Sequence, residues 1–138
     1  MYYIKTLMKN IIYKLLEYLY YFSLVSLSVL YLFPGSLIGY FLYGNMAQQP
    51  DLIPNPIGTS INHLISFMCL STLAFIVRVR KKKFINSFQF FLIISIVFEM
   101  LHHFIPNRAF EYYDLFANVI GVTFTYLLIQ PILKIKIK

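Results

Sequence analysis

Six residues carry groups that could do chemistry, although each lies in or beside a long apolar stretch: His63, Glu99, His102, Arg108, Asp114 and Asn118. Imidazole and carboxylate groups can exchange protons or bind a metal ion, and a guanidinium group can hold an anion. Ionisable groups within apolar spans are costly, and they usually face a bundle interior or a water-filled cavity. We therefore treat these six residues as candidates for one ligand-binding site.

A metal site is one chemistry that these residue types allow. It would combine histidine and carboxylate ligands, both of which zinc accepts. The candidate ligands are His63, His102, His103, Glu99 and Asp114. Glu-x-x-His spacing places two of them on one helix face, but no spacing here is diagnostic of a metal. The sequence therefore predicts a site with no metal and no other cofactor.

Two other interpretations stay open at this point. Glu99 or Asp114 could act as an acid or base with a histidine partner, so the sequence does not decide whether the protein is an enzyme. Alternatively, the polar residues only pin the helices in register. In that case Arg108 would pair with Asp114 or Glu111, and a histidine would pair with Glu99.

The elements that must position these residues are long and apolar. Four stretches approach the roughly 20 apolar residues that a membrane-spanning helix needs: 15–33, 61–77, 84–105 and 112–133. A longer connection, 34–60, joins the first two stretches and is rich in turn-forming residues in its second half. The prediction is an all-α polytopic membrane protein, a four-helix transmembrane bundle that forms a single domain.

Composition supports this prediction independently. The 138 residues are 59% hydrophobic and 12% charged, whereas a soluble domain has about 25% charged residues. These values exclude a soluble enzyme, a disordered tail and a disulfide scaffold. The single cysteine, Cys69, lies in an apolar stretch, where we expect a buried and inert thiol rather than a nucleophile.

The basic residues predict the orientation of the chain in the membrane. Three lysines precede the first span, five basic residues join the second and third spans, and three lysines follow the fourth, so eleven of twelve share one side. Arg108 alone lies opposite. The positive-inside rule then places both termini in the cytoplasm. The bilayer explains the net charge of +7, and we expect no nucleic-acid partner.

The same topology brings the polar residues to one depth. The short connection between the third and fourth spans makes them antiparallel neighbours, so Asp114 lies level with His102, and Asn118 lies level with Glu99. His63 starts the second span at the same side. Further along the fourth span, Gly121 and Thr125 continue the face of Asp114, and this stripe should pack closely against protein. We expect one outward-facing polar cluster.

The stretch 99–121 resembles the signature of VanZ-like membrane proteins. In that signature a Glu is followed by a Gln three residues on, by Pro-x-Arg, and then by Asp, Asn and Gly. The matching residues are Glu99, Pro106, Arg108, Asp114, Asn118 and Gly121. His63 matches a histidine near the start of the family's second span. His102 stands where the family has Gln, and Thr59 and Ser60 replace a charged pair.

The resemblance implies a multi-pass protein of the bacterial cytoplasmic membrane. The family's namesake accompanies glycopeptide-resistance genes and confers low-level teicoplanin resistance. A lipid-linked cell-wall precursor or its headgroup is the ligand class that the resemblance suggests, bound at the outward-facing cluster. The oligomeric state is not predicted.

Overall fold

The computed structural model describes residues 2–50, 58 and 60–136, and these ranges contain helices and no strand. The helices are α1 (Tyr2–Leu32), α2 (Leu37–Tyr43), α3 (Ser60–Arg78), the 3-10 helix η1 (Phe84–Asn86), α4 (Phe88–Leu101) and α5 (Tyr112–Lys136). Part of the predicted loop 34–60, namely residues 51–57 and 59, lies outside the described residues. The all-α prediction is confirmed for the part of the chain described.

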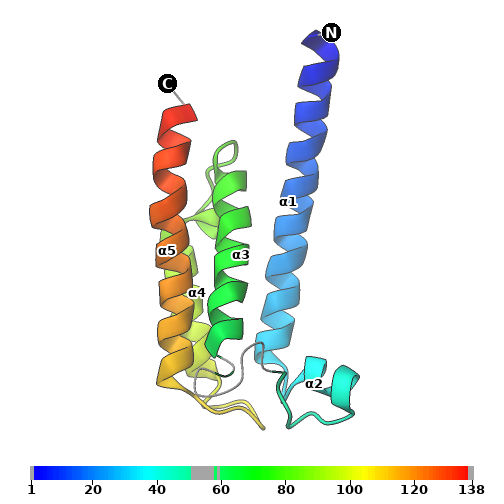
Figure 1. The fold of residues 1–138 in the computed structure, drawn as a ribbon, viewed down its shortest axis with the longest axis vertical. Helices are drawn as coiled ribbons and strands as arrows, with labels where there is room; N and C mark the ends of the chain where they lie inside the picture. The colour runs from blue at the N-terminus through cyan, green and yellow to red at the C-terminus, as the bar shows by residue number, and fades with distance from the viewer. Residues whose placement is uncertain (1, 51–57, 59, 137–138) are drawn as a thin grey trace.

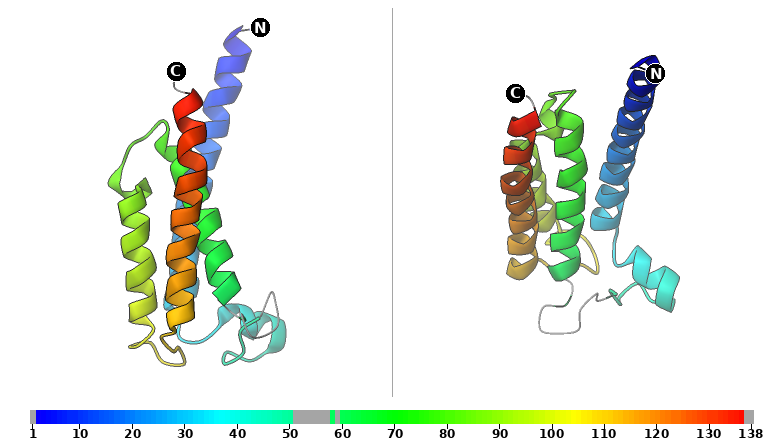
Figure 2. Two further views of the ribbon diagram at one scale, coloured as in Figure 1. Left: turned by 60° about the vertical axis from the view of Figure 1, so that its left-hand side comes forward. Right: turned by 45° about the horizontal axis from the view of Figure 1, so that its top comes forward.

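The three long helices α1, α3 and α5 run side by side, and α4 lies beside α5 on the far side in Figure 1. Two further views show the same arrangement (Figure 2). Helix α3 is central, since it packs most extensively against α5 and also contacts α1. The core between these helices is aromatic and aliphatic, with Tyr20, Phe67, Phe91 and Val122 fully buried.

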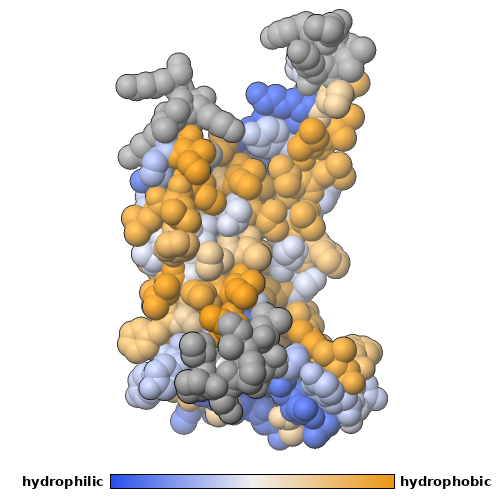
Figure 3. Space-filling view, in the orientation of Figure 1, coloured by the Kyte–Doolittle hydropathy of each residue, from blue (hydrophilic) through white to orange (hydrophobic). Residues whose placement is uncertain are grey.

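Within the described residues, three helices are long and apolar enough to cross a membrane: Thr6–Leu32, Ser60–Arg78 and Tyr112–Ile132. A broad hydrophobic band covers the middle of the molecule, and hydrophilic residues gather mainly toward its two ends (Figure 3). Many large apolar side chains of the long helices are exposed, including Phe22, Phe116 and Leu127. An apolar surface of this extent would be unfavourable in water, so the expected membrane character is supported.

The third predicted span is shorter than expected. Residues 84–105 do not form one helix, because Ser87 caps a new helix by accepting a hydrogen bond from Phe90 N at 3.1 Å. Helix α4 then ends at Leu101, giving 14 residues and a length of roughly 21 Å. A bilayer core is about 30 Å thick, so α4 on its own falls short of a full crossing.

The bundle has two different ends. We define the polar end as α2, the connection 102–111 and the first turns of α3 and α5. We define the basic end as the connection 79–87 with the chain termini, which lie at the opposite end of the bundle (Figure 1).

Gly121 brings α3 and α5 close together, as the polar stripe on the fourth span predicts. A Cβ atom at this position would lie 2.7 Å from Leu64 O and 3.3 Å from Met68 N. One turn further along, Thr125 is buried and its hydroxyl lies 3.5 Å from Met68 O. The absence of a side chain at Gly121 therefore sets the distance between α3 and α5, and with it the separation of residues on their first turns.

Candidate functional site

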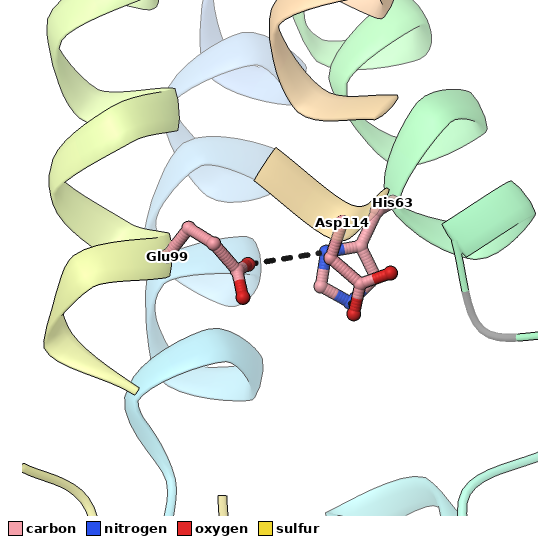
Figure 4. A group of neighbouring side chains, drawn as sticks. All are labelled: His63, Glu99 and Asp114. Carbon is pink, nitrogen blue, oxygen red and sulfur yellow. Dashed lines mark ion pairs between the residues drawn. The ribbon is translucent and has the colours of Figure 1, made fainter. Parts of the chain in front are cut away.

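Three helices bring one ionisable side chain each to the polar end. His63 comes from the first turn of α3, Glu99 from the last turn of α4, and Asp114 from the first turn of α5 (Figure 4). His63 lies between the two carboxylates. Its Nδ1 is 3.6 Å from Glu99 Oε2, and its Nε2 is 3.4 Å from Asp114 Oδ2. All three side chains are buried.

The other oxygen of each carboxylate is held by neighbouring groups. Glu99 Oε1 accepts a hydrogen bond from Glu111 N at 3.1 Å and lies 3.3 Å from His102 Nδ1. Asp114 Oδ1 accepts a hydrogen bond from the hydroxyl of Ser60 at 2.5 Å. These bonds fix both carboxylates, so each presents its second oxygen toward His63.

His102 joins the cluster, as expected for one of the two adjacent histidines. Its Nε2 donates to Tyr31 O at 3.0 Å, and its Nδ1 faces Glu99 Oε1. A carbonyl oxygen only accepts, so Nε2 carries the hydrogen and Nδ1 of a neutral ring is itself an acceptor. The contact between Nδ1 and Glu99 Oε1 is therefore a hydrogen bond only if a second proton lies between these two atoms. His103 is exposed and packs against Phe104 instead.

Tyr31 is a member of the cluster that the sequence did not reveal. Its hydroxyl donates to Asn118 Oδ1 at 2.8 Å and lies 2.7 Å from His63 Nδ1. Its ring stacks on His102 with 5.6 Å between ring centroids. Tyrosines near the ends of membrane-spanning helices are common at the membrane interface, so the residue type of Tyr31 did not indicate that it faces inward. Tyr31 lies near the end of the first predicted span, at the same depth in the bundle as His63 at the start of the second. This shared depth is the signal that could have identified it.

Arg108 lies at the edge of the cluster and does not pair with a carboxylate. The alternative in which the polar residues only pin the helices pairs it with Asp114 or Glu111, but among the described residues it forms no ion pair. Its guanidinium instead donates to Leu30 O at 2.8 Å and Phe33 O at 3.3 Å. Carbonyl groups at a helix C-terminus lack partners within the helix, and a cation there is favourable. Burial lowers the pKa of Arg108, and it remains a cation at neutral pH.

Cys69 also differs from expectation, because its side chain is exposed rather than buried. It lies on the outer surface of α3, well away from the polar cluster. Asn118, by contrast, is fully buried as the stripe on the fourth span predicts, and its Nδ2 lies 3.5 Å from Ser95 O. A thiol nucleophile for the cluster is therefore not supplied by Cys69.

A cavity of about 350 Å³ adjoins the cluster at the polar end. Its lining residues are Ala47, Gln49, His63, His102, Asn107, Arg108, Ala109, Glu111 and Asp114. Most of these side chains are polar, and the two histidines connect the cavity to the buried part of the cluster. A small polar group entering the cavity would reach the cluster directly.

The structure thus brings together His63, Glu99, His102, Asp114 and Asn118, and it places Arg108 at the rim. Ser60 and Tyr31 are additional partners that sequence reasoning missed. The arrangement could transfer protons, hold an anion beside Arg108 or bind a cation between the carboxylates. No family model, curated protein or solved structure matches the chain.

Proposed function

We propose that the protein is a VanZ-like membrane protein whose polar cavity binds the anionic headgroup of a lipid-linked cell-wall precursor. The proposal rests on the signature residues 99–121 together with the cavity beside them. In a bacterial cell, such binding would change susceptibility to glycopeptides such as teicoplanin.

The observation that supports the proposal is the guanidinium group of Arg108 at the wall of the cavity. A guanidinium has five N–H donors, and the two bonds to Leu30 O and Phe33 O leave others available at the cavity wall. Those two bonds also fix the direction of the group. A pre-oriented guanidinium is well suited to bind a phosphate or carboxylate group.

Binding of a purified lipid-linked precursor, measured by native mass spectrometry, tests the proposal. We expect Arg108→Ala to weaken binding by at least about tenfold, the loss typical of one charged hydrogen-bond donor. Arg80→Ala is the matched control, because Arg80 is an exposed arginine at the basic end. Arg108→Lys should bind with intermediate affinity, since it keeps the charge and loses the fork of donors.

The same variants can be expressed in a cell whose teicoplanin susceptibility depends on the protein. Arg108→Ala should lose the phenotype at an unchanged membrane level, while Arg80→Ala keeps it. Equal precursor binding by wild type and Arg108→Ala would contradict the proposal, and so would an equal loss in Arg80→Ala.

The orientation belongs to the same proposal: four spans in the bacterial cytoplasmic membrane, with both termini and the basic end in the cytoplasm. It can be tested in a Cys69→Ser background with one new cysteine at Met46 or at Lys82, both exposed. A membrane-impermeant maleimide applied to whole cells, with the outer barrier permeabilised where one is present, should label position 46 and not position 82. The reverse pattern would contradict the orientation.

A second candidate function is acid–base catalysis on a lipid-linked substrate. The position of His63 between Glu99 and Asp114 favours it, because a histidine held by two carboxylates can shuttle a proton. This candidate requires turnover. Absence of product when purified protein is incubated with lipid-linked precursors from pH 5 to 8 would count against it and leave the binding proposal standing.

A further inference from the structure

One carboxylate oxygen in the cluster is buried without a donor. Glu99 has 0% of its surface exposed, and Oε2 has no hydrogen-bond partner in the described part of the chain. Its sister atom Oε1 accepts a hydrogen bond from Glu111 N and lies 3.3 Å from His102 Nδ1. Leaving a buried charged acceptor without a donor costs more free energy than leaving a neutral one without a donor. Oε2 points toward His63 (Figure 4).

The hydrogen bonds around Tyr31 decide which nitrogen of His63 carries its hydrogen. Asn118 directs Nδ2 to Ser95 O, so its Oδ1 accepts the single hydroxyl hydrogen of Tyr31. The hydrogen between Tyr31 and His63, whose atoms lie 2.7 Å apart, must then come from His63 Nδ1. In a neutral imidazole this leaves Nε2 as a bare acceptor.

That bare nitrogen faces another acceptor. Asp114 Oδ2 lies 3.4 Å from His63 Nε2, while Asp114 Oδ1 is already bonded to Ser60. Two acceptors that face each other repel unless a proton or a metal ion lies between them. One ligand atom from each of His63, Glu99 and Asp114 lies within 4.8 Å of the others. Two atoms that bind one zinc ion are at most about 4.4 Å apart, so a shift of the Glu99 carboxylate from Nδ1 toward Nε2 of His63 would let one ion contact all three residues.

We infer that these three residues bind a divalent transition-metal ion, with His63, Glu99 and Asp114 as its protein ligands. Imidazole nitrogen and carboxylate oxygens suit zinc and its neighbours in the series. Two ligand atoms of a tetrahedral zinc site are about 3.4 Å apart, which matches the separation of Nε2 and Oδ2.

The surroundings also fit a metal site that keeps one position open. Tyr31, Ser60 and the backbone N–H of Glu111 hold the ligands through their other atoms, as the outer contacts of metal sites do. His63 and Asp114 line the cavity, so a fourth ligand could reach the ion from there. The inference is independent of the headgroup proposal, which depends on Arg108.

Zinc binding to the purified full-length protein in detergent tests the inference. The protein is stripped with a chelator, and zinc is then titrated in competition with a chromogenic indicator. Metal content is measured after gel filtration. We expect one zinc ion per chain, and affinity reduced by at least about tenfold in Glu99→Gln and in Asp114→Asn, which replace one ligand with a near-isosteric amide.

His103→Ala is the matched control, because it removes an exposed histidine next to the cluster. It should bind zinc like wild type, and added zinc should raise the melting temperature of both but not of Asp114→Asn. Wild-type protein that retains no zinc would overturn the inference and would indicate a proton between His63 Nε2 and Asp114 Oδ2 instead. Equal affinities in wild type and both amide variants would overturn it as well.

Discussion

The two ends of the bundle use the same kinds of charged side chain in opposite ways. At the basic end, Lys81 Nζ lies 2.6 Å from Glu17 Oε2, and the side chain of Lys81 is 55% exposed. At the polar end, Glu99 is fully buried beside His63 and His102. The shorter, better-formed ion pair is thus the more exposed one.

The difference shows that burial, rather than distance, decides what such a contact contributes. An exposed pair gains little because water already solvates both charges, and most such pairs are worth about 0–1 kcal/mol. A buried carboxylate has given up its water, so it depends on each neighbour that remains. The ion pair of Lys81 and Glu17 at the basic end resembles an ordinary surface pair. The contacts at the polar end form a buried network, so removing any one member should lower the stability of the protein substantially.

Glu99→Ala should have the largest effect on stability. The change removes the acceptor for Glu111 N and the partner of His102, and it leaves a cavity between the helices. We expect a loss of about 3–5 kcal/mol. The measurement is the fraction of protein that stays monodisperse on size-exclusion chromatography after heating in detergent, with a chelator present. Glu99→Gln should lose less stability than Glu99→Ala. A Glu99→Ala variant as stable as wild type would contradict the argument that buried contacts contribute more than exposed ones.

Asn86→Ala should rank second, although Asn86 lies at the basic end. This side chain is fully buried, donates to Lys81 O at 2.7 Å and accepts from Lys83 N at 3.0 Å. Losing both bonds should cost about 2 kcal/mol in the same heating experiment. This variant separates burial from position, because a negligible loss would show that location at one end matters more than burial.

Lys81→Ala should have the smallest effect. The hydrogen bond to Glu17 raises the pKa of Lys81 above its ordinary value of 10.5, so the pair is fully formed at neutral pH. Its stabilisation would fade only as the pH rises through the raised pKa. The heating curve of the variant should match that of wild type at pH 7. A loss as large as that of Asn86→Ala would refute the argument from exposure.

Much of the polar cluster could be predicted from the sequence because polar residues are conspicuous in apolar spans. Depth along antiparallel helices was enough to bring Glu99, His102 and Asp114 together. Tyr31 could not be predicted in the same way. Its depth in the bundle depends on how α1 packs, and no short connection fixes α1 against α4. Its ring is also common at membrane interfaces, so its type carried no signal.

The remaining differences have equally specific causes. Charge alone favours a carboxylate partner for Arg108, which was one of the alternatives, but the unpaired carbonyl groups at the end of α1 accept its hydrogen bonds instead. The predicted third span is too long because hydropathy carries no information about the capping hydrogen bond of Ser87. Both differences involve hydrogen bonds of backbone groups, which the pattern of side chains in the sequence does not reveal.

The short length of α4 has a consequence for the lipid around it. Its outward face is apolar, with Ile93, Val97 and Met100 exposed, yet the helix covers only roughly 21 Å. In the proposed four-span arrangement, the hydrophobic mismatch would thin the bilayer beside α4 or tilt the bundle. Headgroups on that flank would then sit nearer to the level of Glu99 than they do beside α1, so the thickness of the host membrane would tune access to the cluster.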